Sequence, residues 1–95
     1  MIVWLLKSTK EEIRVKAYLT GEALCQGIQV HYYLLERYAE TERQYGIRVE
    51  CGADQAELRD LTPVAGRARG LLEAMCRGAV TPVAVRDVVE DWLLE

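Results

Sequence analysis

The spacing of apolar residues changes once along the chain, and this change limits the folds that the chain can adopt. Through about residue 61 apolar and polar positions alternate, a period of two that is typical of β-strands. From residue 62 onward apolar residues recur every three or four positions, as on one face of a helix. No linker separates the two parts. The pattern predicts one α+β domain over residues 1–95, with a sheet in 1–61 and a helical hairpin in 62–95.

The first part predicts a sheet of four or five strands. Its connections are too short for a crossover helix, so successive strands should pair antiparallel as a meander. The first strand is expected in Met1–Lys7, a nearly continuous apolar run. The other strands are expected at Glu12–Leu19, Gln29–Arg37, Tyr45–Cys51 and Gln55–Leu61.

Alternation within the strands assigns side chains to the two faces of the sheet. In Glu12–Leu19 the apolar set is predicted to face the core and the polar set to face outward. Turns are expected at Thr20–Gly27 and Gly52–Asp54, with a solvated connection at the charge-rich Glu36–Gln44. The residues predicted to face the core are Ile13, Val15, Ala17, Leu19, Val30, Tyr32, Leu34, Tyr45, Ile47, Val49, Cys51, Ala56 and Leu58.

The second part contains the sequence Thr-Pro-Val-Ala twice, beginning at Thr62 and at Thr81. Thr is a favoured N-cap, and Pro suits the first helical position because the N–H that it lacks would be unpaired there. Two helices are therefore predicted, both on one face of the sheet, the first ending at Arg77 with Gly78 as a left-handed C-cap. Their predicted buried residues are Val64, Ala68, Leu71, Leu72 and Met75, then Val85, Val88, Val89, Trp92 and Leu93. Close packing of the first helix on the sheet is the expected reason for Gly66 and Gly70.

Charge and hydropathy exclude several classes of protein. The formal net charge of −3, from 12 Lys and Arg against 15 Asp and Glu, is too small for a nucleic-acid coat or an acidic tail. No apolar run approaches the roughly 18 residues of a membrane span. Charged residues follow Met1–Leu6 at once, so no secretory signal is expected, and the predicted compartment is the cytosol (cytoplasmic).

Residues that usually carry chemistry are sparse. Cys25, Cys51 and Cys76 form no C-x-x-C pair and are expected to be free thiols, although a zinc site completed by His31 is chemically possible. His31 is the single histidine and has no recognisable orienting partner. Neither glycine-rich phosphate-binding motif occurs. No catalytic residue, metal or cofactor is predicted, and an enzyme or a small-ligand protein is disfavoured.

The sheet face away from the helices is the predicted interaction surface. Its cations, aromatic rings and leucine suit contact with another protein, including a second copy of the chain. Single-stranded nucleic acid is the alternative partner, because bases can stack on Tyr while cations neutralise phosphates. Duplex DNA is disfavoured as a partner of the helical hairpin, since Thr81–Glu95 carries one cation and four carboxylates. The residues of the predicted surface are Arg14, Lys16, Tyr18, His31, Tyr33, Leu35 and Arg48.

Three segments resemble a family of small uncharacterised proteins from clostridia-type Firmicutes. They are Val30–Glu36 (VHYYLLE), Tyr45–Val49 (YGIRV) and Val80–Trp92 (VTPVAVRDVVEDW), and the resemblance extends over about two thirds of the chain. The family is a domain of unknown function. The resemblance implies a bacterial cytosolic protein with an α+β fold, and it supplies no catalytic residues. The small core, the apolar Met1–Leu6 segment and the aromatic outer face lead us to expect a non-enzymatic interaction module that self-associates as a homodimer.

Overall fold

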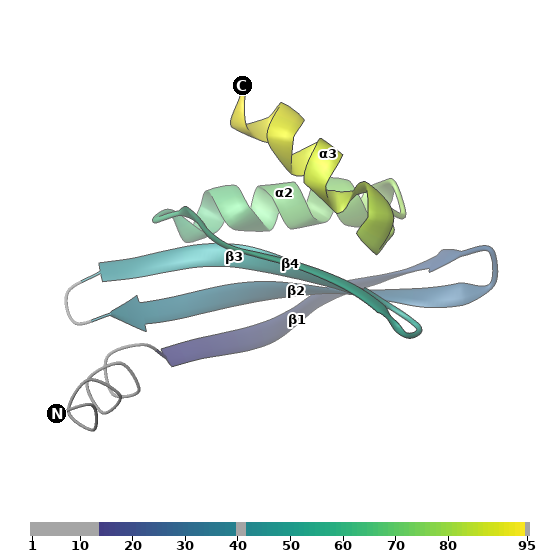
Figure 1. Cartoon of the computed structure of the whole chain (residues 1–95), viewed down its shortest axis with the longest axis horizontal. Coiled ribbons are helices and arrows are strands. Elements are labelled where there is room, and N and C mark those ends of the chain that lie inside the picture. Colours follow the sequence, from purple (N-terminus) through teal and green to yellow (C-terminus); the bar gives the residue numbers. More distant parts are fainter. Residues whose placement is uncertain (1–13, 40–41, 95) are drawn as a thin grey trace, which may run out of the picture.

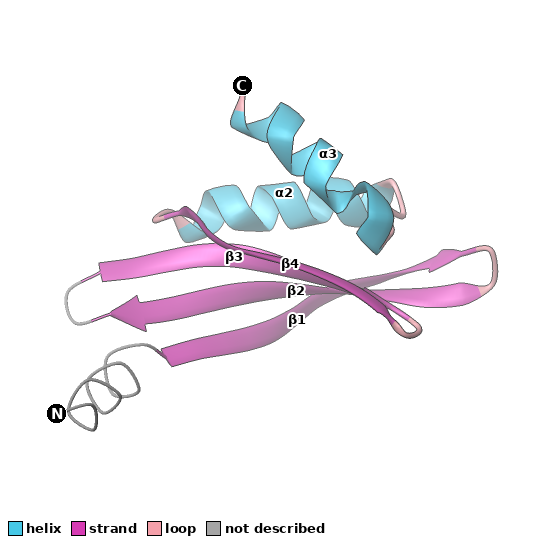
Figure 2. Cartoon of the chain, in the orientation of Figure 1, coloured by secondary structure: helices cyan, strands magenta, loops and turns pink. Residues whose placement is uncertain are grey.

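A computed structural model describes residues 14–39 and 42–94 and confirms the predicted fold class. The described part contains a four-stranded antiparallel sheet in the order β1-β2-β3-β4, with both helices on one face (Figure 1). Figure 2 shows the two layers, helical and strand, separately coloured. The predicted strand Met1–Lys7 lies outside the described residues. The elements are β1 (Arg14–Cys25), β2 (Ile28–Ala39), β3 (Glu42–Cys51), β4 (Asp54–Thr62), α2 (Ala65–Arg77) and α3 (Pro82–Leu93).

The strands are longer than alternation alone predicts. Most of the expected turn Thr20–Gly27 belongs to β1, which continues to Cys25 through a bulge between Leu19 and Gly21. The chain then reverses at Gln26 and Gly27, whose φ values of 53° and 80° suit a tight two-residue hairpin turn. The expected connection Glu36–Gln44 is likewise mostly strand, because main-chain pairing continues from β2 to β3 past the charged side chains.

The core lies between the sheet and the two helices, as predicted from the spacing of apolar residues. Tyr32, at its centre, is fully buried, and its hydroxyl donates to the Val80 carbonyl O at 2.7 Å. Cys51, Ala56 and Leu58 are partly buried against the core, also on the predicted face. The buried cluster consists of Val30, Tyr32, Leu34, Tyr45, Ile47, Val49, Ala68, Leu71, Leu72, Met75, Val85 and Val89.

The helix ends differ in detail from the prediction. Helix α2 begins at Ala65, so Thr62 precedes the helix, where its Oγ1 accepts from the Val64 N–H at 3.1 Å. Thr81 is the N-cap of α3 and is followed by Pro, as expected, but its side chain makes no capping bond. The left-handed residue after α2 is Ala79 (φ 50°) and not Gly78 (φ −90°).

Three further packing predictions are wrong, all at positions on the solvent side of the helices. Val64 and Leu93 are 51% and 56% exposed, since each lies at a helix end where the apolar stripe turns away from the sheet. At Gly66 and Gly70 a Cβ would meet nothing within 4 Å. Neither glycine therefore serves close packing on the sheet.

The molecule is elongated. Its extents are 50 × 30 × 20 Å, and its Cα radius of gyration is 14.8 Å, against the roughly 12 to 13 Å of a compact chain of this length. The β1–β2 hairpin projects beyond the helical layer (Figure 1). In the described residues no helix combines the length and apolarity needed to cross a membrane.

Candidate interaction surface

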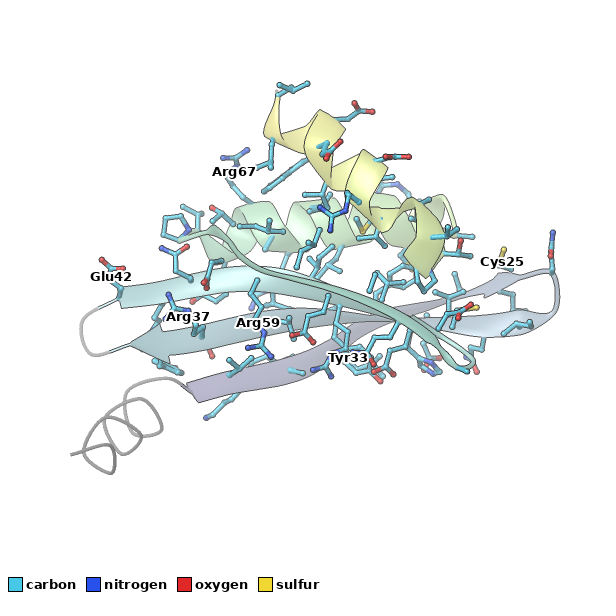
Figure 3. All side chains as sticks on the ribbon, viewed as in Figure 1. Cys25, Tyr33, Arg37, Glu42, Arg59 and Arg67 are labelled. Atoms are coloured by element: carbon cyan, nitrogen blue, oxygen red, sulfur yellow. The ribbon has the colours of Figure 1, made fainter. Side chains whose placement is uncertain are left out.

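The register of β1, β2 and β3 divides the predicted surface between the two sheet faces. Val30, Tyr32 and Leu34 face the helices, so the residues that alternate with them, His31, Tyr33 and Leu35, lie on the opposite face, called the outer face below. Arg48 pairs directly with Tyr33 and shares this face. Four of the seven predicted residues are therefore brought together, and Tyr33 is labelled below the sheet in Figure 3.

The predicted outward position of Lys16 and Tyr18 is wrong. Tyr18 pairs with the core residue Leu34, and its hydroxyl donates to Glu36 Oε1 at 3.1 Å on the helix side of the sheet. Lys16 shares that side, because it alternates with the same parity. Both side chains are exposed on that side. Arg14 is the first residue of β1 and is paired with Tyr38.

The two faces of β1 are exchanged relative to the prediction, so its apolar residues lie on the outer face. Val15, Ala17 and Leu19, which were predicted to face the core, pair with Arg37, Leu35 and Tyr33 of β2. Leu19 is 53% exposed. In the described residues no helix lies over this face. We call the set the apolar strip, consisting of Val15, Ala17, Leu19, Tyr33 and Leu35. Ala17 and Leu19 are exposed, Val15 and Tyr33 are partly exposed, and Leu35, predicted as a surface residue, is buried.

The outer face is ionic over β3 and β4 and at Arg37 of β2. Glu57 accepts from Arg48 Nε at 2.9 Å and also from Arg59 Nε, while Arg37 Nε lies 2.6 Å from Asp60 Oδ1. Burial acts to raise the pKa of Glu57, but the hydrogen bonds from the two guanidinium groups outweigh it and hold that pKa below its ordinary value. These cations are therefore already paired with carboxylates of the same face. We call this set the ionic half, consisting of Arg37, Arg48, Glu50, Glu57, Arg59 and Asp60.

Aromatic contacts lie where the two halves meet. The Arg48 guanidinium lies 5.7 Å from the centre of the Tyr33 ring, and the His31 ring lies 6.5 Å from it at a tilt. His31 Nε2 is 3.4 Å from Glu22 Oε2. The outer face thus changes from apolar at β1, through this aromatic group, to ionic at β4.

The helix side contains features that sequence reasoning missed. Glu36, predicted to lie in a solvated connection, is buried and accepts from the hydroxyls of Tyr18 and Tyr45 at 3.1 and 3.2 Å. The hydrogen bond to Glu36 raises the pKa of Tyr18. A groove also runs between β1 and α2, with a main hollow of about 520 Å³. Neither feature leaves a periodic signal, since both depend on where α2 lies relative to the edge strand.

The described residues offer little for catalysis or metal binding. No group of three or more His, Cys, Asp or Glu in this part of the chain could hold a metal ion. His31 lies on the outer face, whereas Cys25, Cys51 and Cys76 pack against the core, so the three thiols and the imidazole do not converge. All three cysteines are free and partly buried.

The fold and the exposed faces define an α+β meander domain, with helices over one face of the sheet and the apolar strip on the other. The chain belongs to the family of unknown function DUF6514, whose model matches residues 10–95. No curated protein and no solved structure shows significant similarity to it.

Proposed function

We propose that the protein is a cytosolic, non-enzymatic interaction module that self-associates through the apolar strip. The observation that carries the proposal is Leu19, 53% exposed among apolar neighbours on a sheet face without helical cover in the described residues. Ala17 and Leu19 are exposed side by side, flanked by the partly exposed Val15 and Tyr33. Neighbouring exposed apolar residues are typical of interfaces, and they favour association because contact removes them from water.

A second copy is the partner that fits this face best. In a two-fold contact the same patch is used by both chains, so an apolar strip meets another apolar strip. The ionic half then lies beside the contact, as the polar rim does in known interfaces. Its charges are neutralised within each chain, so two copies can approach without unpaired like charges.

Single-stranded nucleic acid is the weaker alternative. Tyr33, between Arg48 and His31, resembles one element of a stacking platform. However, Arg37, Arg48 and Arg59 are each engaged by a carboxylate. Phosphate binding would therefore have to displace these ion pairs, which favours a protein partner.

The test replaces Leu19 with Arg, which places a charge within the proposed contact. Light scattering coupled to size exclusion at micromolar concentration should give twice the 10.8 kDa chain mass for the unmodified protein and the single mass for Leu19→Arg. Val83→Arg is the control, because Val83 is also apolar and 90% exposed but lies on α3. A monomeric unmodified protein, or equal dissociation by both variants, would overturn the proposal.

A further inference from the structure

Two adjoining hollows form one groove on the helix side of the sheet, along the edge strand β1. They share Thr20 and Arg69, and together they extend from Tyr18 to Gly21 on β1 and from Ala65 to Arg77 on α2. Because the start of α2 lies near Tyr18 and its end near Gly21, helix and strand run in the same direction along the groove. We call it the β1–α2 groove.

The groove exists because β1 lacks bulk where α2 approaches it. A Cβ at Gly21 would lie 3.1 Å from the Cys76 Sγ, a tight contact, so a side chain there would crowd the space between β1 and α2. The bulge at Thr20 displaces the strand just before this point. Buried Leu34 and Leu72 line the groove and supply an apolar floor.

Among the described residues, the cations of this groove have no carboxylate partner, unlike those of the ionic half. Arg69 and Arg77 are exposed on the α2 wall, and no carboxylate of the described residues lies within 4.0 Å of either. The buried carboxylate of Glu36 already accepts two tyrosine hydroxyls. The α2 wall therefore presents a positive charge at Arg69, where the two hollows meet, and another at Arg77, where the groove ends, with Glu73 between them.

The spacing of these charges suits an extended peptide. Arg69 and Arg77 are eight helical residues apart, or about 12 Å, whereas residues four apart in a strand are separated by about 13 Å. Glu73 lies midway between the two arginines on the helix. It would face the middle residue of the peptide segment that spans them. A strand lying beside β1 can also use the main-chain groups of the sheet edge, apart from the bulge.

We propose that the β1–α2 groove binds an extended acidic segment of a partner protein, with acidic side chains four residues apart facing Arg69 and Arg77. The groove and the apolar strip lie on opposite faces of the sheet. The inference is therefore independent of self-association, and each can fail without the other.

Fluorescence anisotropy with a panel of labelled β-branched peptides tests the groove. The peptides carry two glutamates spaced two, four or six residues apart, and one carries lysines at the four-residue spacing. The four-residue glutamate peptide should bind tightest, and the lysine peptide should not bind. Arg69→Glu with Arg77→Glu should weaken that binding at least about tenfold, and Glu73→Lys should strengthen it.

Arg86→Glu is the control, because it makes one such Arg-to-Glu change at an exposed position of α3 outside the groove. Amide chemical shifts should move at Gly21 and Cys76 when the peptide is added. Absence of binding by every glutamate peptide, no preference for the four-residue spacing, or equal weakening by Arg86→Glu would overturn the proposal. Unchanged circular dichroism shows that each variant is folded.

Discussion

Gly46 and Gly66 differ in what surrounds the point where a side chain would attach. A Cβ at Gly46 would lie 2.2 Å from the Leu58 carbonyl O and 2.7 Å from the Arg59 Cα, whereas none of the surrounding atoms reaches within 4 Å at Gly66. β4 approaches β3 closely here because its register shifts opposite Tyr45 and Ile47. The sheet therefore requires a glycine at Gly46, but the helix does not require one at Gly66.

Alanine substitutions at the two glycines should change stability in opposite directions. Gly46→Ala forces backbone atoms apart and should lower the free energy of unfolding by about 2 kcal/mol. Gly66→Ala removes backbone freedom from the unfolded chain at an exposed helical position and should raise it by about 0.5 to 1 kcal/mol. Urea unfolding measures both, and a stability loss at Gly66 equal to that at Gly46 would contradict the packing described.

Tyr32 links the stability of the core to alkaline pH. Burial, followed by the nearby Cys76, Cys25 and Cys51, raises its pKa from 10.0 to about 12. The folded protein then holds a proton that the unfolded chain releases, so this contribution is fully present below pH 10 and is lost as pH rises through about 12.

Tyr32→Phe removes both the titration and the hydrogen bond to Val80. The variant should be about 1 kcal/mol less stable at neutral pH, because the Val80 carbonyl O loses its donor. Its stability should also fall less steeply than that of the unmodified protein between pH 10 and 12. Denaturant midpoints measured at several pH values give both quantities, and parallel declines would show that Tyr32 does not contribute.

At the scale of elements, alternation predicted β2, β3 and β4 and their core faces, because the residues of these strands that face the helices are the apolar ones. It failed for β1, where Val15, Ala17 and Leu19 face away from the helices. A periodic pattern shows which residues share a face but not which face is covered. It also ended the strands early, since paired charges such as Arg37 and Asp60 stabilise strand ends without apolar residues. Among the residues of the predicted surface, those of β2 and β3 could be grouped from the sequence. The β1–α2 groove could not be predicted, because it depends on tertiary packing.

In helix α3 the apolar period was predicted correctly, but the burial of some of its residues was not. Trp92 is only partly buried against the core, with the Arg67 guanidinium 4.8 Å from its ring centre (Figure 3 labels Arg67). Trp92→Ala should therefore cost about 2 kcal/mol of unfolding free energy, less than for a fully buried ring. Leu93→Ala, at a position 56% exposed, should cost less than about 0.5 kcal/mol. Thermal or urea unfolding compares them, and equal costs would contradict the orientation of α3.

At the scale of the whole molecule, the sheet has one face covered by helices and one face divided between an apolar strip and an ionic half. The elongated shape leaves much of this small chain exposed, which makes association a natural source of additional burial. The opposite side carries the β1–α2 groove with Arg69 and Arg77. The two surfaces would allow a self-associated protein to bind a separate partner at the same time.

Intermolecular nuclear Overhauser effects, recorded on a mixture of isotopically labelled and unlabelled chains, test self-association through the apolar strip most directly. The strip predicts cross-peaks from the Leu19 methyl groups of one chain to Leu19, Tyr33 or Val15 of the other. Cross-peaks confined to α2 and α3, or none at concentrations where scattering shows a dimer, would place the contact elsewhere and contradict the assignment.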